Sequence, residues 1–242
     1  MKQAPPLTVN LAGLRKELQA ASDPERARGM ALFFKTGKGH YGEGDKFIGV
    51  TVPAQRKIAV RYRKLPLADI ARLFQSPIHE HRFTALEILV LQYESGEPDA
   101  QREIFDFYLK QTARINNWDL VDTSAPYIVG EHLLSRSRKV LYRLAESASL
   151  WERRIAVVAT QTFIRAGELA DTFAIAGLLL GDGHDLIQKA IGWMLRETGK
   201  QSKPALLEFL RKNYSRMPRT SLRYAIERFP PAERNRILKG MF

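Results

Sequence analysis

The sequence of 242 residues contains no cysteine. This absence excludes disulfide bonds and metal sites built from thiolates, and it is compatible with a reducing compartment. The segment Met1–Pro6 lacks the apolar stretch of a signal peptide, and the longest apolar run, at about residues 174–180, is too short to cross a bilayer. We therefore expect a cytoplasmic protein that has no membrane segment.

Acidic residues are scarce relative to basic ones. The sequence has 26 Asp and Glu residues and 38 Lys and Arg residues, which gives a net charge of +12. An excess of this size attracts polyanions and favours a nucleic-acid partner. Charge by itself confers affinity without specificity, and the alternative is a solvated cationic surface that has no particular partner.

The sequence also lacks the alternating pattern of β-strands, and from Pro53 onward its pattern is helical. Near the N-terminus we expect one helix over about residues 7–20. A second should begin at Asp23-Pro24-Glu25, where an aspartate cap precedes a proline in the first turn, and run to about Phe34. Further helices are expected to begin near residues 53, 66, 78, 98, 118, 137, 150, 168, 185, 202, 218 and 230. An all-α fold follows.

Similar short segments recur around Ala85, Ala156, Ala190 and Ala225, which are spaced by 71, 34 and 35 residues. A unit of about 35 residues with two helices is typical of a HEAT-like array. We expect a single domain over residues 1–242, with N-terminal helices and a glycine-rich loop in 1–52 and repeats in 53–242. The repeats would form a curved α-solenoid whose second helices line a concave basic groove. The alternative is a non-repetitive helical bundle.

Four glycines fall within residues 37–44, which predicts a loop. The loop matches neither the P-loop nor G-x-G-x-x-G, so it is not a recognisable nucleotide-binding motif. We interpret it as a connector whose Lys38 and Tyr41 contact a DNA backbone. His79 and His81 would lie on different faces of a helix, and H-E-x-x-H is absent. We expect no metal and no organic cofactor.

The stretch Asn116–Asp122 contains the most informative pair of residues. In a helix, Trp118 and Asp122 share one face, because they are four residues apart. An aromatic ring beside a carboxylate, in a basic chain, suits a cationic ligand. The alternatives are core packing for Trp118 and a helix cap or ion pair for Asp122, although Asp119 is better placed to cap. The predicted second helices add further aromatic and basic candidates: Trp151, Arg153, Arg154, Lys189, Trp193, Arg196, Arg219, Arg223 and Arg228.

Two strings carry a resemblance to a known family. Trp-Asp-Leu-Val-Asp at 118–122 and Gln-Lys-Ala-Ile-Gly-Trp-Met-Leu-Arg-Glu at 188–197, together with Trp-Glu-Arg-Arg at 151–154, resemble the alkylpurine DNA glycosylase D family. These are DNA repair enzymes built from HEAT-like repeats. The resemblance extends from about Asp23 to Ile226.

The resemblance implies roles for individual residues. Asp122 would be the catalytic aspartate, Trp118 and Trp193 the active-site tryptophans, and Arg154 the ligand of a DNA phosphate. Two positions depart from the family pattern. Asn117 stands where a second tryptophan is frequent. Phe33 stands where a tyrosine is frequent, so that a ring is kept and a hydroxyl is lost.

The implied activity is that of a monofunctional DNA glycosylase in base excision repair. It would hydrolyse the N-glycosidic bond of cationic N3- or N7-alkylated purines, such as 3-methyladenine and 7-methylguanine, in double-stranded DNA without base flipping. We expect a monomer that contacts DNA through the side chains of Arg154, Phe33, Tyr41, Lys38, Arg153, Lys189, Arg196, Arg219 and Arg223. The alternatives are a non-catalytic binder of branched or distorted DNA, which the two departures and the charge motivate, and a protein–protein scaffold.

Overall fold

The computed structural model describes residues 9–242, and every regular element in these residues is a helix. An isolated β-bridge pairs Lys46 with Ile78. The predicted all-α class is confirmed, and only residues 7 and 8 of the predicted first helix lie outside the described part. In that part, no helix has both the length and the apolar content needed to cross a bilayer. The chain divides into two compact units, Met1–Ser124 and Ala125–Phe242, and the single domain with a boundary at residue 52 stays a prediction.

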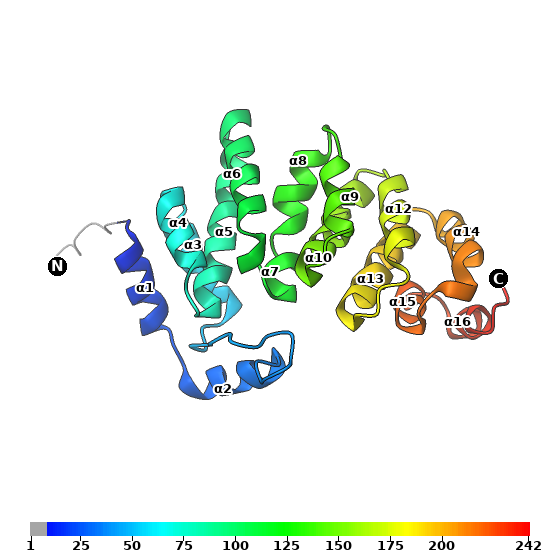
Figure 1. The fold of residues 1–242 in the computed structure, drawn as a ribbon, viewed down its shortest axis with the longest axis horizontal. Coiled ribbons are helices and arrows are strands. Elements are labelled where there is room, and N and C mark those ends of the chain that lie inside the picture. Colours follow the sequence, from blue (N-terminus) through cyan, green and yellow to red (C-terminus); the bar gives the residue numbers. More distant parts are fainter. Residues whose placement is uncertain (1–8) are drawn as a thin grey trace. The chain divides into compact units, whose positions relative to one another are not determined.

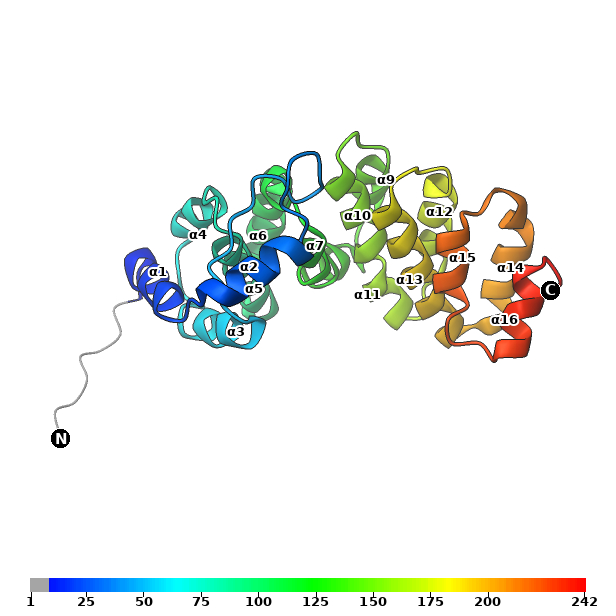
Figure 2. The same cartoon turned by 90° about the horizontal axis from the view of Figure 1, so that it is seen from below.

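The first unit places its N-terminal helices and loop around a long helix, α5. Its elements are α1 (Leu11–Ala20), α2 (Pro24–Phe33), α3 (Val52–Arg61), α4 (Leu67–Phe74), α5 (His79–Ser95), α6 (Pro98–Lys110), η1 (Thr112–Arg114) and α7 (Trp118–Asp122). Helix α5 packs against α3, α4, α6 and α7. Helix α2 and the loop that follows it lie across one end of α5 (Figures 1 and 2).

Local capping explains where these helices begin. Asn10 Oδ1 accepts a hydrogen bond from the Gly13 amide at 2.8 Å, at the start of α1. The predicted start of α2 is confirmed, since Asp23 Oδ1 accepts from the amides of Glu25 and Arg26 at 3.0 Å each. Such caps satisfy amides that have no partner within the helix.

The chain that leaves the glycine-rich loop is fastened to α5. The buried Glu80 carboxylate accepts hydrogen bonds from the amides of Ile48, Gly49 and Val50 at 3.0, 2.7 and 3.3 Å. Gly49 has a φ of +83°, and a Cβ there would lie 2.1 Å from the Asp23 carbonyl oxygen. Glycine is required because this backbone conformation and this close approach exclude a side chain.

The second unit is organised around α13. Its elements are the π-helix η2 (Pro126–Gly130), α8 (Glu131–Leu133), α9 (Lys139–Ala145), α10 (Leu150–Ala159), α11 (Gln161–Arg165), α12 (Ala170–Leu179), α13 (Asp185–Gln201), α14 (Lys203–Asn213), η3 (Tyr214–Arg216), α15 (Arg219–Ala225) and α16 (Pro231–Leu238). Helix α13 packs against both α10 and α15 (Figure 2).

The alanines that marked the sequence repeat are core residues. Ala85 in α5, Ala156 in α10, Ala190 in α13 and Ala225 in α15 are all buried. A small side chain at these positions lets neighbouring helices approach closely. The spacing seen in the sequence therefore follows helices that contribute to the cores of the two units.

Gly192 marks the closest approach of α13 to α15. A Cβ at this position would lie 2.4 Å from Tyr224 Cβ and 2.6 Å from the Ser221 carbonyl oxygen. Across the same contact, Ser221 Oγ donates a hydrogen bond to the Gln188 carbonyl oxygen at 2.9 Å. The two helices are thus held too close for any residue larger than glycine.

We predict that Gly192→Ala destabilises the protein, because the added methyl group meets backbone atoms that cannot move aside cheaply. The expected loss is about 1–3 kcal/mol, the usual cost of overpacking a core. Gly177→Ala on α12 is the matched control, since a Cβ there has only Arg216 Nη2 nearby, at 4.0 Å. Urea unfolding followed by circular dichroism measures the stability of both variants. Equal unfolding midpoints for Gly192→Ala and Gly177→Ala would contradict the prediction.

Candidate active site

Helix α7 carries Trp118 and Asp122, and both side chains are half-buried. The helix begins at Trp118 because Asn117 caps it, with Asn117 Oδ1 accepting from the Trp118 amide at 2.8 Å. Asn117, rather than Asp119, therefore holds the capping position. Asp119 Oδ1 accepts from the next amide, that of Leu120, at 2.9 Å, and its other oxygen points to a different partner.

Two phenylalanines from the end of α2 pack around Trp118. The Phe34 ring stacks on the indole with a centroid distance of 5.2 Å and an interplanar angle of 18°. The Phe33 ring meets it edge-on, at 5.9 Å and 73°. Phe34 is buried, whereas 66% of Phe33 is exposed. The structure therefore brings together two of the predicted site residues, Phe33 and Trp118, and adds Phe34 as the support that covers one indole face.

A buried ionic bridge links the loop, α5 and α7. His79, the first residue of α5, donates from Nδ1 to Asp45 Oδ2 at 3.0 Å and from Nε2 to Asp119 Oδ2 at 2.8 Å. Arg82 Nη2 donates to the other Asp45 oxygen at 2.5 Å. Asp45, His79 and Arg82 are buried. The imidazole ring therefore bridges two carboxylates, and the buried one, Asp45, also pairs with a guanidinium.

The bridge sets the charge states of its members. Burial by itself would lower the pKa of His79, but the charge of Asp119 and the hydrogen bonds with Asp119 and Asp45 raise this pKa to about 9. Burial would likewise raise the pKa of Asp45, but the hydrogen bond with His79 and the charge of Arg82 outweigh it and lower that pKa. At neutral pH the bridge therefore contains an imidazolium between two carboxylates.

The histidine two residues further along α5 behaves in the opposite way. Burial, together with the charges of Arg15 and Arg82, lowers the pKa of His81 to about 4. Its Nδ1 is hydrogen-bonded to Ser76 Oγ at 2.8 Å. The sequence His79-Glu80-His81 therefore contains three buried polar residues with separate structural tasks. From the sequence, this triplet was considered only as a metal site. The bridge from Asp45 through His79 to Asp119 was missed, because its members are 34 and 40 residues apart and form no local pattern.

Asp122 lies at the other end of α7, close to a buried tyrosine of α6. Burial, and to a lesser degree the charge of Asp122, raises the pKa of the Tyr108 hydroxyl, while Ser124 opposes the shift. Tyr108 Oη and Ser124 Oγ are 3.0 Å apart, and Ser124 Oγ donates to the Leu120 carbonyl oxygen at 2.6 Å. The C-terminal end of α7 is thereby tied to α6.

In the second unit, Arg154 and Trp193 lie on α10 and α13. Arg154 is buried, and its Nη1 donates to the Leu186 carbonyl oxygen in the first turn of α13 at 2.6 Å. Trp193 is half-buried. Arg153 is engaged within the fold, because its Nε pairs with Asp182 Oδ2 at 2.7 Å and its Nη1 donates to the carbonyl oxygens of Ser147 and Ala148.

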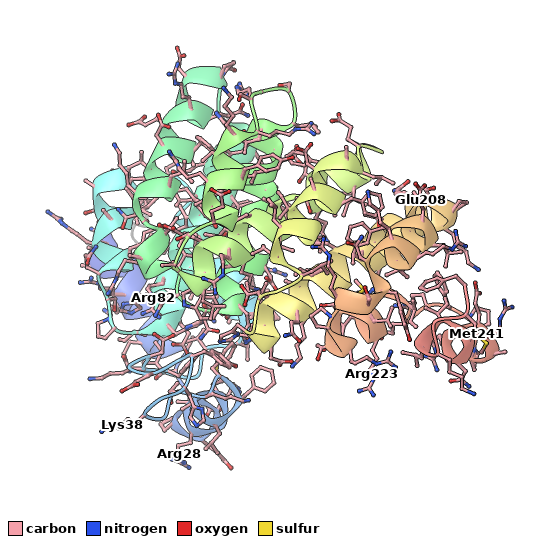
Figure 3. All side chains as sticks on the ribbon, turned by 45° about the vertical axis from the view of Figure 1, so that its right-hand side comes forward. Arg28, Lys38, Arg82, Glu208, Arg223 and Met241 are labelled. Carbon is pink, nitrogen blue, oxygen red and sulfur yellow. The ribbon has the colours of Figure 1, made fainter. Side chains whose placement is uncertain are left out.

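The other residues of this unit that are predicted to contact DNA differ in their ion-pair and hydrogen-bond partners within the protein. Lys189 pairs with Asp185 at 2.7 Å, one turn back along α13. Arg196 pairs with Glu197 and with Glu227, and Arg219 donates to the Leu238 carbonyl oxygen at 3.0 Å. Arg223 is exposed and projects from α15 (Figure 3).

The end of α2 and the glycine-rich loop form a surface that is both basic and apolar. Lys38 is exposed and projects from the loop, as Arg28 does from α2 (Figure 3), and Tyr41 is half-buried. A shallow hollow beside them is lined by Arg28, Leu32, Lys35 and His40, among others, and 81% of Leu32 is exposed. This surface suits a polyanion that also offers apolar faces.

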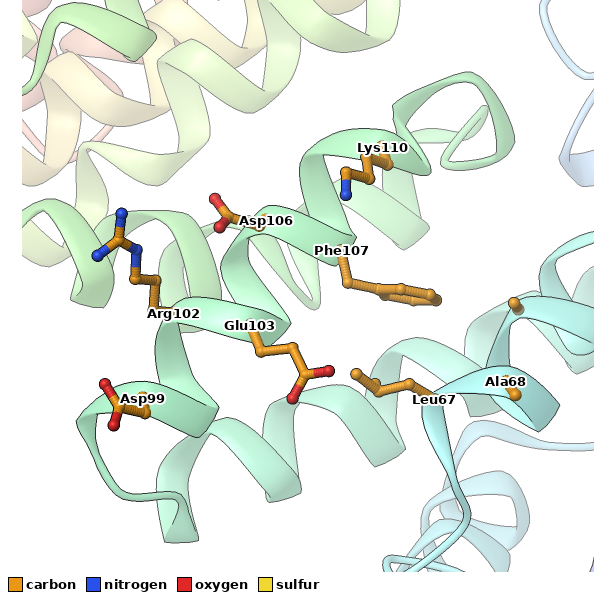
Figure 4. A pocket seen from close by; sticks show the side chains of 9 residues that line it. Leu67, Ala68, Asp99, Arg102, Glu103, Asp106, Phe107 and Lys110 are labelled. Carbon is orange, nitrogen blue, oxygen red and sulfur yellow. The ribbon is translucent and has the colours of Figure 1, made fainter.

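A second hollow in the same unit has the opposite character. It lies between α4 and α6, and the carboxylates of Asp99, Glu103 and Asp106 stand around it beside Arg102 and Lys110 (Figure 4). Phosphate groups would be repelled by these carboxylates. The basic surface around α2 is therefore the better candidate for a nucleic-acid contact in the first unit.

Comparison with known proteins identifies the family. Residues 14–229 match the family model of DNA alkylation repair enzymes. The chain belongs to the DNA alkylation repair enzyme family. A solved structure described as a predicted DNA alkylation repair enzyme from Enterococcus faecalis has the same fold, with a TM-score of 0.69 over 87% of this chain and 97% of that one, at 16% identity. Among curated proteins, none shows significant similarity. The family resemblance seen in the sequence is confirmed.

We predict that the free energy of unfolding of this repair-family protein falls as the pH rises from about 6.5 to about 9. In that range the folded protein keeps the His79 proton, whereas the unfolded chain releases it, so the contribution present below about pH 6.5 is progressively lost. Urea unfolding across this range should show a slope that His79→Gln reduces.

His81→Gln is the control for that slope. The neutral form of His81 is already favoured in the folded protein, so its contribution changes only as the pH falls from about 6.5 towards 4. An identical pH dependence in the wild type and in His79→Gln would contradict the prediction.

Proposed function

We propose that this member of the DNA alkylation repair family is a monofunctional DNA glycosylase acting on cationic N3- or N7-alkylated purines in double-stranded DNA. The observation that carries the proposal is the placement of Trp118 and Asp122 at the two ends of α7, four residues apart, with Phe34 stacked on one face of the indole. A carboxylate beside a fixed aromatic ring suits a reaction in which positive charge develops.

The reaction follows from the chemistry of the substrate. Alkylation at N3 or N7 leaves the purine positively charged and weakens its glycosidic bond. As that bond breaks, its electron pair neutralises the departing base, and positive charge moves onto the deoxyribose. Asp122 would stabilise this oxocarbenium-like sugar and accept a proton from the water that attacks C1′. The indoles of Trp118 and Trp193 would each add about 0.5–2 kcal/mol of attraction to the cation.

We propose that the DNA backbone supplies most of the binding energy. Arg154 would hold a phosphate, and its hydrogen bond to the Leu186 carbonyl oxygen would orient the guanidinium. The helix pairs would act as HEAT-like repeats whose second helices line a basic groove, with the lesion remaining stacked in the duplex. A purine that is already cationic needs no protonation, so a pocket for an extruded base is not required.

We predict that Asp122→Asn lowers release of 7-methylguanine and 3-methyladenine from methylated duplex DNA by about 10²–10³-fold, the usual effect of losing one electrostatic partner of a transition state. Binding to undamaged DNA should remain. Asp106→Asn, which neutralises an exposed carboxylate on α6, is the matched control and should release bases at the wild-type rate.

The same assay separates the proposal from its alternative. If the wild type releases no base from methylated DNA and binds branched DNA tightly, the protein is a non-catalytic DNA binder. Undiminished release by Asp122→Asn would also refute the assignment of the catalytic carboxylate.

We also predict that Arg223→Ala weakens binding to undamaged duplex DNA and reduces the slope of log K against log salt by about 0.9, the value for one lost phosphate contact on B-DNA. Arg102→Ala is the control, because it removes the same charge from an exposed position among the carboxylates of α6. Fluorescence anisotropy over a range of salt concentrations measures both. Equal slopes for the two variants would count against a phosphate contact at Arg223.

A further inference from the structure

The ionic bridge around His79 has no place in the chemistry described so far, although it touches the helix that carries Trp118 and Asp122. We propose that His79 is a positioning residue, which fixes the pose of α7 through Asp119 and couples that helix to the glycine-rich loop through Asp45. This proposal rests on the proposed function, in which Trp118 and Asp122 form part of the active site.

Helix α7 needs external support because it is short. It contains five residues, and a helix of this length has little stability of its own. One support is the 2.8 Å hydrogen bond between His79 Nε2 and Asp119 Oδ2. A second support acts just before the helix, where Asn116 and Asn117 donate to the two oxygens of Asp45 at 3.4 and 3.5 Å. Each support therefore involves one of the two carboxylates, Asp119 or Asp45, that His79 holds by a hydrogen bond.

A second path connects His79 to the indole through aromatic rings. Phe47 stacks on the His79 ring at 4.6 Å and 25°. Phe34 lies against the same ring at 5.2 Å and also stacks on Trp118 at 5.2 Å. A charged imidazole gains further stabilisation from neighbouring aromatic faces. His79 therefore supports Trp118 both through the backbone of α7 and through the ring of Phe34.

The charged groups that face His79 come from three elements. Asp45 approaches from the loop, Asp119 from α7, and Arg82 lies one turn along α5 and shares Asp45. When His79 loses its proton, one of the two carboxylates loses its donor. Arg82 still neutralises Asp45, so Asp119 is the group left without its positive partner. Deprotonation therefore removes the charge attraction at the end of the bridge that holds α7, where the neutral ring has at most one N–H left to donate.

Hydrogen exchange tests the positioning role without reference to activity. In His79→Gln, amides from Asn116 to Ser124 should exchange at least about tenfold faster than in the wild type, because local opening becomes easier. Amides of α13 should be unchanged. His81→Gln, a substitution of a buried neutral histidine on the same helix, should leave α7 within about twofold of the wild-type rate.

Asp119→Asn is a second variant, needed because His79→Gln removes a central group. An asparagine keeps an oxygen for the Leu120 amide but not the charge that faces His79. Exchange should rise in α7, while residues 46–50, which Glu80 holds, stay protected. If α7 exchanges at the wild-type rate in both variants, the proposal is overturned.

Single-turnover base release adds a readout that general loss of stability would not produce. The rate of base release by the wild type, corrected for spontaneous release, should fall as the pH approaches about 9. At pH 7, His79→Gln should release bases at least about tenfold more slowly than the wild type, while its affinity for DNA stays within about twofold of the wild-type value. A wild type without base release refutes the proposed function, and the exchange result then decides the positioning role alone. Wild-type rates in His79→Gln would overturn the proposal.

Discussion

The buried imidazole of His79 between Asp45 and Asp119 is the interaction on which the first unit depends. It joins three segments that are 34 and 40 residues apart in the chain. A buried charge is tolerated only when it is paired, and losing one partner leaves the others uncompensated. His79 pairs with both carboxylates and Arg82 pairs with Asp45, so these contacts join the loop, α5 and α7.

The aromatic cluster and the loop backbone depend on the same arrangement. Phe34 lies between His79 and Trp118, so its position is defined by the bridge on one side and by the candidate active site on the other. Gly49 allows the backbone to lie close to the start of α2, and the Glu80 carboxylate accepts hydrogen bonds from the amides of residues 48–50. The glycine-rich loop is therefore more than a connector. Its C-terminal end is a fastened part of the support for α7.

Some basic side chains of the chain form ion pairs within the protein, and others are exposed on its surface. Arg82, Arg153 and Arg196 are engaged in ion pairs within the protein. Lys38 and Arg223 are exposed and project from the loop and from α15. A net charge of +12 thus measures attraction to polyanions, but it does not say which cations make contacts. Burial and ion pairing, which only the fold reveals, make that distinction.

The sequence by itself determined what depends on local chemistry: the helix starts at capping residues such as Asp23, the buried alanines at Ala156 and Ala190, and membership of the repair family. It also placed Trp118 and Asp122 on one helix, because their spacing is a property of the helix alone. Only the tertiary structure decided that Phe34 covers the indole and that His79 joins Asp45 to Asp119. These contacts link residues distant in sequence, whose pairing follows from packing and burial rather than from any periodic pattern.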